Sequence, residues 1–320
     1  MPFLENVLRG RNVPRERMLE VAEHYQHFGG VSPINSQNRA LIQALEAELA
    51  ANGPSLPIYW GNRNWHPLLP DTLQSMAAAG VKRALAFFTS AFSSYSGCRQ
   101  YRENVLAAQA TVGEVAPQVD KLRAFFNHPG FIEPMQQRVA AALGDIAADR
   151  QAAARLIFTA HSIPTSMADG CKYVAQLSEA SQLVAEAFPG MQFSLAYQSR
   201  SGPPTQPWLE PDVGDVIRQL AADGVRDVVV VPIGFISDHM EVMFDLDYEA
   251  QHIAESVGVN MVRAGTVGVH PQFVRMIREL IAERMGLQRE KRSLGSMGPS
   301  HDICAVDCCP APVRPPRPAA

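Results

Sequence analysis

The sequence predicts an α/β protein with open parallel sheets, and three observations predict this class. Segments of strand-forming residues alternate with amphipathic segments along the chain, as in repeated βαβ units. The run Val228-Val229-Val230-Val231 is typical of a strand buried on both faces of a parallel sheet. The segment from Ala79 to Ala84 resembles the segment from Asp223 to Val228, and each leads from an expected helix into an expected strand. This internal similarity predicts two similar domains that meet near residue 150.

The composition is that of a folded protein of moderate charge. Of its 320 residues, 47% are hydrophobic and 19% are charged, and the net charge is −4. This balance gives no electrostatic case for binding nucleic acid. No apolar run reaches the ~18–20 residues of a membrane span, and residues 1–5 lack the features of a signal peptide. We therefore expect a cytoplasmic protein with no transmembrane segment, whose five cysteines are free thiols or metal ligands rather than disulfides.

The first half of the chain contains expected helices and strands separated by Gly-rich and Pro-rich turns, such as the turn from Gly29 to Pro33. Apolar residues at helical spacing predict helices at Glu5–Phe28, Asn35–Ala51, Asp71–Ala79 and Arg99–Ala110, with another after Gly130. Short apolar runs bounded by turn residues predict strands at Pro57–Gly61, Ala84–Phe88 and Leu122–Phe126.

The second half repeats the alternation. The expected strands are Ala153–Ala160, Phe193–Tyr197, the valine run and Asn260–Arg263. The expected helices are Met167–Phe188, Asp212–Asp223, an acidic helix after the valine run, and Pro271–Met285. Beyond Arg292 the chain is rich in Gly, Ser and Pro, which predicts a poorly ordered tail.

The acidic helix after the valine run has two interpretations. Asp238 precedes Glu241 by three residues, so the pair fits a capping box at a helix N-terminus. Glu241, Asp245 and Glu249 are also spaced four residues apart, which places three carboxylates on one helix face. Like charges at this spacing repel each other, so the stripe suggests a bound cation or a water channel. A capping box alone does not explain Asp245 and Glu249.

A histidine follows the strand that opens the second half of the chain. Ligands of open α/β sheets bind beyond the carboxyl ends of the strands, and both His161 and Glu241 follow strand ends. An imidazole and a carboxylate facing each other across a cleft can bind a divalent first-row metal or move protons near neutral pH. The alternative is that His161 is a hydrogen-bonded structural residue.

Several motifs together resemble ferrochelatases from residue 2 to about residue 286. They are Pro2–Asn6, Gly29–Pro33, Thr159–Pro164, Tyr197–Ser199, Pro207–Pro211 and Pro232–Glu241, in this order. The resemblance implies a lyase of heme biosynthesis that inserts Fe²⁺ into a porphyrin. It also implies a chelatase-like fold of two similar Rossmann-like, doubly wound domains with a cleft between them, and transient contacts with neighbouring heme-pathway enzymes. The segment Ser93–Tyr101 resembles the bacterial branch that uses coproporphyrin III rather than protoporphyrin IX.

The resemblance also implies roles for individual residues. His161 and Glu241 match the positions that bind the incoming iron and handle the pyrrole protons, while Asp245 and Glu249 resemble an acidic path for metal or protons. The positions that match porphyrin contacts are Tyr25, Ser32 and Tyr101. Arg9 and Arg11 are expected to meet propionates, with solvated arginines as the alternative. Trp60, Trp65 and Phe92 are candidates for an apolar cleft lining or for the core.

The N-terminal segment departs from the family pattern. Family members begin with a strand and a Gly-Thr-Pro-like turn before the segment that matches Pro2–Asn6, and their helix-end arginine is replaced here by Leu8. We therefore expect an N-terminal domain (1–150) without its first strand, a C-terminal domain (151–290) that carries His161 and Glu241, and a tail (291–320). A non-catalytic tetrapyrrole-binding or Fe–S-binding protein on the same fold is the alternative function.

The tail is the second departure. It carries Cys304, Cys308 and Cys309 within six residues. The resemblance implies a [2Fe–2S] cluster, which some family members hold with C-terminal cysteines and one internal cysteine, and such a cluster needs four ligands. Cys171 is the expected fourth ligand and Cys98 is its rival. The alternative is a disordered tail with free thiols.

Overall fold

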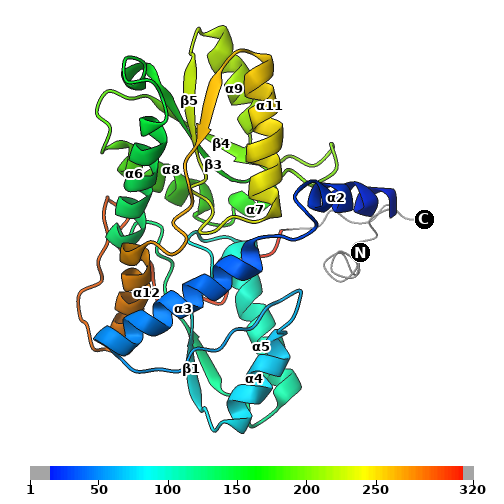
Figure 1. Ribbon diagram of the computed structural model, residues 1–320. Helices are drawn as coiled ribbons and strands as arrows, with labels where there is room; N and C mark the ends of the chain where they lie inside the picture. Colours follow the sequence, from blue (N-terminus) through cyan, green and yellow to red (C-terminus); the bar gives the residue numbers. More distant parts are fainter. Residues whose placement is uncertain (1–14, 313–320) are drawn as a thin grey trace.

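The computed structural model describes residues 15–312, and its two parallel sheets lie one above the other in Figure 1. The predictions for Arg9 and Arg11, and the expectation of a missing first strand, fall outside the described residues. Parallel strands alternating with helices confirm the predicted α/β class. Among the described helices, none is both long and apolar enough to span a membrane.

The larger sheet contains four parallel strands in the order β4-β3-β5-β6. These are β3 (Arg155–His161), β4 (Phe193–Gln198), β5 (Asp227–Val231) and β6 (Asn260–Arg263). Phe158 pairs with Val231, and all four valines of β5 are fully buried, as the β-branched run predicted. The chain continues from β3 to one side and from β5 to the other, so the switch point of this sheet lies between β3 and β5.

Helices cover both faces of this sheet. Leu156 and Phe158 of β3 face a core shared with α6 (Pro129–Gly144), α8 (Tyr173–Ala185) and α12 (Pro271–Arg284). Ile157, on the opposite face, packs in a second core with α9 (Val213–Ala222) and α11 (Gln251–Ser256). This alternation along β3 follows from the two-residue period of a strand.

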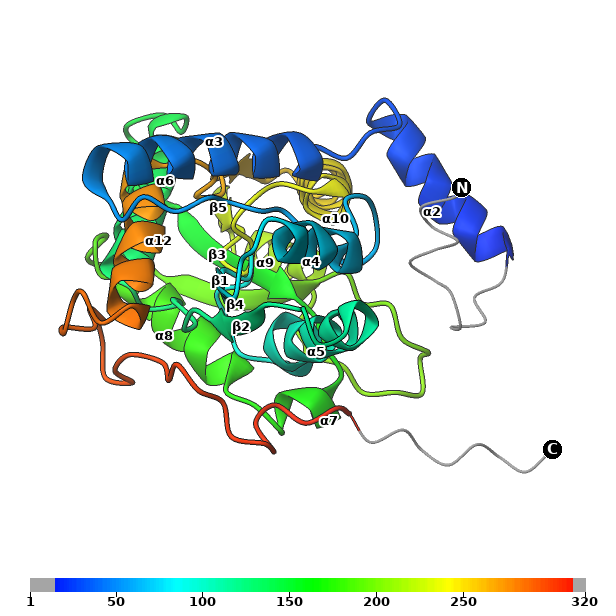
Figure 2. The same cartoon turned by 90° about the horizontal axis from the view of Figure 1, so that it is seen from below.

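The smaller sheet pairs β1 (Arg83–Ala86) with β2 (Gln118–Lys121) in parallel. It is covered by α4 (Leu69–Ala78) and α5 (Gln100–Val112), whose Leu73 and Ala108 share a small core. The long α3 (Ile34–Asn52) runs across the molecule and contacts α12, while α2 (Arg15–His27) projects from one side (Figure 2). Although α6 precedes residue 150 in the chain, it packs on β5 and β6 of the larger sheet.

Three expected elements differ from the structure. Pro57–Gly61 forms no strand, and its neighbourhood contains only an isolated bridge between Asn62 and Leu68. The strand expected at Leu122–Phe126 lies earlier, as β2, and Phe125 and Phe126 are core residues beyond its end. The expected helix Met167–Phe188 is split into α7 (Thr165–Ala168) and α8. At the break, a Cβ on Gly170 would lie 3.0 Å from the Pro310 side chain, so the tail packs closely against this glycine.

The described part of the tail has no helix or strand, but it follows a definite course beside α8 and α7 (Figure 2). The Asn127 side chain donates hydrogen bonds to the carbonyls of Leu294 (3.0 Å) and Gly298 (2.9 Å). Glu179 of α8 accepts one from the Met297 backbone N–H at 3.1 Å. Composition therefore predicted the irregular conformation, whereas the order of this segment comes from contacts with the body.

Candidate functional site

His161 ends β3 with its imidazole in a defined orientation. Its Nδ1 lies 2.5 Å from the carbonyl oxygen of Ser162, which can only accept a hydrogen bond. In the neutral ring, Nδ1 must therefore carry the proton, which leaves the Nε2 lone pair unprotonated. The Tyr173 hydroxyl also donates to the His161 carbonyl at 3.0 Å, which fixes the strand end. His161 is thus presented with a basic, ligand-competent nitrogen.

Glu241 meets this nitrogen from the neighbouring strand end. Its Oε2 lies 3.8 Å from His161 Nε2, and the side chains of Glu241 and His161 are 57% and 34% exposed. Glu241 belongs to α10 (Met240–Val242), which follows β5 in the chain, and β5 is the sheet neighbour of β3. The two groups therefore meet at the switch point of the larger sheet, and both are accessible to a ligand.

The capping box expected for Asp238 and Glu241 is absent, so that interpretation is wrong. His239 caps α10 instead, because its Nδ1 accepts from the Val242 N–H at 3.4 Å. The Asp238 carboxylate accepts from Arg263 (3.1 Å) and from the side chain of Gln37 (3.4 Å). Glu241 is consequently not engaged in closing the helix end.

The acidic stripe continues along a π-helix, η3 (Met243–Ala250), between α10 and α11. Asp245 is half-buried and accepts hydrogen bonds from Ser199 and, at 3.4 Å, from Gln198. Burial raises the pKa of Asp245 to about 7, and the charges of Glu241 and Glu249 add to this effect. An Asp with this pKa can take up and release a proton near neutral pH.

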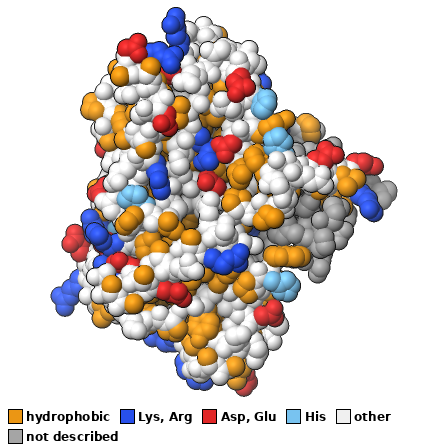
Figure 3. All heavy atoms as spheres, viewed as in Figure 1, with side chains coloured by type: hydrophobic (Ala, Val, Ile, Leu, Met, Phe, Trp, Pro, Cys, Tyr) orange, Lys and Arg blue, Asp and Glu red, His pale blue; other side chains and the backbone are white. Residues whose placement is uncertain are grey.

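A large cleft of about 2470 Å³ opens in front of this stripe. Glu241, Asp245 and Glu249 lie on the cleft wall; His161 does not line the cleft but lies 3.8 Å from Glu241. The sequence-predicted residues on the cleft walls are Tyr25, Ser32, Tyr101, Trp60 and Trp65. Phe92, by contrast, is 2% exposed and belongs to the core. Val31 and Ile34 on the cleft wall are exposed. Figure 3 shows hydrophobic side chains across the middle of the molecule, where α3 runs.

Some residues of the site were missed from the sequence. The partners of Asp245 are Gln198, the last residue of β4, and Ser199, which follows it. Ser199 has a left-handed φ of 61°. Their place directly after a strand was a usable signal, since such positions cluster at functional sites. Tyr25 was expected to touch the ligand. Burial, followed by the charge of Glu241, raises the pKa of its phenol, which is consistent with a position near the acidic stripe.

Arginines on the cleft wall were also missed. Arg63 stacks its guanidinium over the Tyr101 ring, 5.3 Å from the ring centroid. Arg200 donates to the backbone carbonyls of Pro204 and Gln206 at 3.4 Å and 3.2 Å. Both groups retain donors that can face an anionic ligand.

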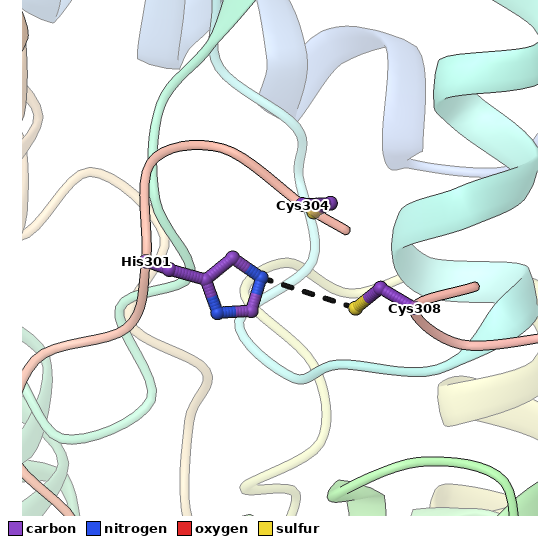
Figure 4. A group of neighbouring side chains, drawn as sticks. All are labelled: His301, Cys304 and Cys308. Atoms are coloured by element: carbon purple, nitrogen blue, oxygen red, sulfur yellow. Dashed lines mark hydrogen bonds between the residues drawn. The ribbon is translucent and has the colours of Figure 1, made fainter. Parts of the chain in front are cut away.

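The tail cysteines and both internal cysteines are free thiols that gather in a second region. Within the tail, His301, Cys304 and Cys308 place their ligand atoms within 4.8 Å of one another (Figure 4). Cys98 and Cys304 are neighbours in this region, and their interaction lowers the pKa of Cys304 and raises that of Cys98. Cys309 Sγ lies 3.7 Å from Cys308 Sγ.

Cys171 lies close to the same region. Its thiol donates to the Met167 carbonyl at 3.2 Å. Burial raises the pKa of Cys171, and the neighbouring Cys308 raises it further. The structure therefore brings both rival internal cysteines to the tail, and the expected donors lie together as a group.

Comparisons with known proteins agree on one family. The family model for ferrochelatase matches residues 1–285. A ferrochelatase of Rhodopirellula baltica is 59% identical over 99% of this chain and 90% of its own length. A coproporphyrin III ferrochelatase of Streptomyces griseus is 51% identical over 100% of this chain and 91% of its own length. The solved structure of SirB from Bacillus subtilis with Fe³⁺ has a TM-score of 0.56 at 15% identity, covers 80% of this chain and 93% of its own, and supports the fold alone.

Proposed function

Because the chain belongs to the ferrochelatase family and is an enzyme that inserts Fe²⁺ into a porphyrin, we propose that His161 and Glu241 carry out this reaction. The observation that supports this assignment is the 3.8 Å separation between His161 Nε2 and Glu241 Oε2 beside the cleft. First-row divalent ions form bonds of about 2.0–2.2 Å to such nitrogen and oxygen atoms, so one ion can touch both. Imidazole and carboxylate are also ligands that such a metal can exchange for pyrrole nitrogens.

Insertion must remove two pyrrole N–H protons for each Fe²⁺ that enters the macrocycle. The unprotonated Nε2 of His161 is the acceptor nearest to Glu241 in the described site. Once protonated, the imidazole can pass this proton to the Glu241 carboxylate. Glu241 is the first residue of the acidic stripe, so the proton can continue along it. The products are the metallated porphyrin and two protons, so charge is conserved.

Asp245 and Glu249 form the path by which protons or metal ions pass along the cleft wall in this proposal. The raised pKa of Asp245, about 7, supports a proton-transfer role. Ser199 and Gln198 hold the Asp245 carboxylate in place through hydrogen bonds. A positioned carboxyl with balanced protonated and ionised forms can relay protons in either direction.

Coproporphyrin III is the proposed substrate. Curated relatives with about half of their residues identical carry the name coproporphyrin III ferrochelatase. Coproporphyrin III has four propionates and protoporphyrin IX has two, so the former gains more from guanidinium groups around a cleft. Arg63 and Arg200 on the cleft wall are suited to this role, and Arg9 and Arg11 remain candidates outside the described residues. Tyr25, Ser32 and Tyr101 are proposed to contact the macrocycle.

The test is anaerobic Fe²⁺ insertion into coproporphyrin III and protoporphyrin IX, measured side by side. We expect insertion into both, with a higher kcat/KM for coproporphyrin III. Faster insertion into protoporphyrin IX would reject the substrate assignment. No insertion into either would reject the proposed catalytic role of the site.

We also propose a [2Fe–2S] cluster in the region where the tail cysteines meet Cys98 and Cys171, and the side chains present there fit such a cluster. A two-iron cluster requires four ligands, usually thiolates, and five free cysteines meet here. Cys304 and Cys308 are the central tail ligands, and the expectation from the sequence adds Cys309. When bound, the cluster would supply a redox-active metal centre and the free energy to order the tail. The fourth ligand is an internal cysteine: Cys171 lies near Cys308, whereas Cys98 lies near Cys304.

Protein purified without oxygen should be red-brown, contain about two irons per chain and bleach with dithionite. Cys308→Ser should remove the colour. Cys98 lies close enough to Cys304 to shift its pKa, which supports Cys98 as the internal ligand, so Cys98→Ser should remove the colour and Cys171→Ser should not. The opposite result would return this role to Cys171. Iron-free, colourless protein from an iron-replete preparation would end the cluster proposal without affecting that for His161 and Glu241.

A further inference from the structure

The closest set of metal-ligating side chains in the tail includes a nitrogen. His301, Cys304 and Cys308 lie with their ligand atoms within 4.8 Å of one another, and the His301 ring points toward Cys308 (Figure 4). His301 Nε2 lies 3.8 Å from Cys308 Sγ. The three residues come from one short segment of the tail, which carries them without any helix or strand.

These distances fit a tetrahedral metal. Bonds of about 2.3 Å to sulfur and 2.0–2.1 Å to nitrogen place a sulfur and a nitrogen ligand of one tetrahedral ion roughly 3.5–3.6 Å apart. The 3.8 Å between His301 Nε2 and Cys308 Sγ is within a few tenths of an ångström of this separation. Cys98 and Cys304 are a second pair of neighbouring thiols, since each shifts the pKa of the other. A two-iron cluster needs two such pairs, one on each iron.

Cys309 is the alternative to His301 as the second ligand beside Cys308. Its Sγ lies 3.7 Å from Cys308 Sγ, yet Cys309 is not part of the close group. It is 5% exposed and has a left-handed φ of 52°. The next residue, Pro310, packs against Gly170, where a Cβ would be only 3.0 Å away. Cys309 is therefore held in a packed position, where a free cysteine serves as a small apolar side chain.

The chain at His301 and just after it is anchored by contacts that need no metal. Lys121 Nζ donates to the His301 carbonyl at 3.2 Å. Asp302 forms an ion pair with Lys291, and Arg102 donates to the Ala305 carbonyl at 3.3 Å. The imidazole is thus presented to Cys308 by the fold itself, as expected for a preorganised ligand.

We infer that His301 is a nitrogen ligand of the metal centre, taking the place expected for Cys309. The inference rests on the proposed cluster. Cys98 and Cys304 then bind one iron, and Cys308 and His301 bind the other. A neutral imidazole in place of a thiolate removes one negative charge from the centre, which raises its reduction potential.

The test is pulsed EPR on the full-length protein, purified without oxygen and reduced with dithionite. One preparation carries natural histidine and the other ¹⁵N-histidine. We expect a strongly coupled nitrogen whose signal changes from ¹⁴N to ¹⁵N on labelling. His301→Cys should keep the red-brown colour, lose this nitrogen signal and lower the reduction potential. Cys309→Ser should keep the colour, the iron content and the nitrogen signal.

The outcomes separate this inference from the cluster proposal. A red-brown protein without a strongly coupled histidine nitrogen overturns the assignment of His301 alone. Loss of colour and iron in Cys309→Ser, with His301→Cys spectrally unchanged, returns the ligand position to Cys309. A wild-type protein without iron overturns the cluster and this inference with it.

Discussion

The cleft site and the tail differ in what holds their side chains in place. His161 and Glu241 follow neighbouring strands of a buried parallel sheet, so the fold brings them together without any ligand. The tail cysteines lie on a segment with no helix or strand, held by hydrogen bonds from Asn127, Lys121 and Arg102. Changes in the cleft should therefore affect chemistry with little effect on stability. Loss of metal from the tail should affect stability first.

The largest effect is expected from His161→Ala. This change removes both the proposed iron ligand and the proposed proton acceptor, so insertion should fall by more than ~1000-fold. Porphyrin should still bind, because the cleft walls are formed by other residues. Fluorescence titration with metal-free porphyrin and an anaerobic insertion assay measure the two properties separately. Near-normal turnover of a folded variant would contradict the assignment.

Asp245→Asn should have a smaller effect that depends on pH. The pKa of Asp245, about 7, means that the carboxyl gains proton-accepting capacity as pH rises through 7. The wild-type rate should therefore increase across this range, and the variant should lose that increase along with about tenfold in rate at pH 8. The exposed Asp215→Asn is the matched control. An unchanged pH profile would remove Asp245 from the path.

The same carboxyl also affects stability, with a definite sign. Its folded pKa is raised above the ordinary value of 3.8, so the folded state holds more protons than the unfolded state between about pH 4 and pH 7. The wild-type free energy of unfolding should fall across that range relative to the Asn variant. Urea unfolding of both proteins at pH 5 and pH 7 checks the sign.

Cys308→Ser tests whether metal binding in the tail contributes to stability. Loss of the proposed cluster would remove ordering free energy from the tail, and the melting temperature should fall by roughly 2–4 °C for each kcal/mol lost. Insertion at 25 °C should remain, since the cleft residues are held by the sheet. Wild-type protein from iron-starved cells is the control and should melt like the variant. An equal melting temperature for iron-loaded and iron-free wild type would contradict this view of the tail.

The smallest effect is expected from Arg63→Gln. An exposed charge pair contributes about 0.2–1 kcal/mol, so KM for coproporphyrin III should rise by up to about fivefold with kcat retained. KM for protoporphyrin IX should change less if Arg63 meets a propionate found only on coproporphyrin III. Arg226→Gln, away from the cleft wall, is the matched control. Equal changes for both porphyrins would leave Arg63 without a role in selecting the substrate.

The sequence predicted the cleft site better than the tail for a physical reason. Strand ends are visible as local patterns, so His161 and Glu241 could be placed at one edge of a sheet before the structure was known. The partners of Asp245 were missed: Ser199 follows a different strand, β4, which was a usable signal, but no local pattern shows the left-handed turn that aligns it with Asp245. The π-helix was also invisible, since four-residue spacing suits an α-helix equally well. The course of the tail depends on distant residues such as Asn127, which leave no local pattern.

The most direct test of the central claim is Glu241→Gln, with insertion rate and melting temperature measured on the same preparation. The side chain is 57% exposed and does not close a capping box, so its charge contributes little to folding. If Glu241 binds iron or moves protons, the rate should fall by roughly 100-fold or more while the melting temperature stays nearly unchanged. A variant that inserts iron at the wild-type rate, or one that loses activity only because it unfolds, would contradict the account.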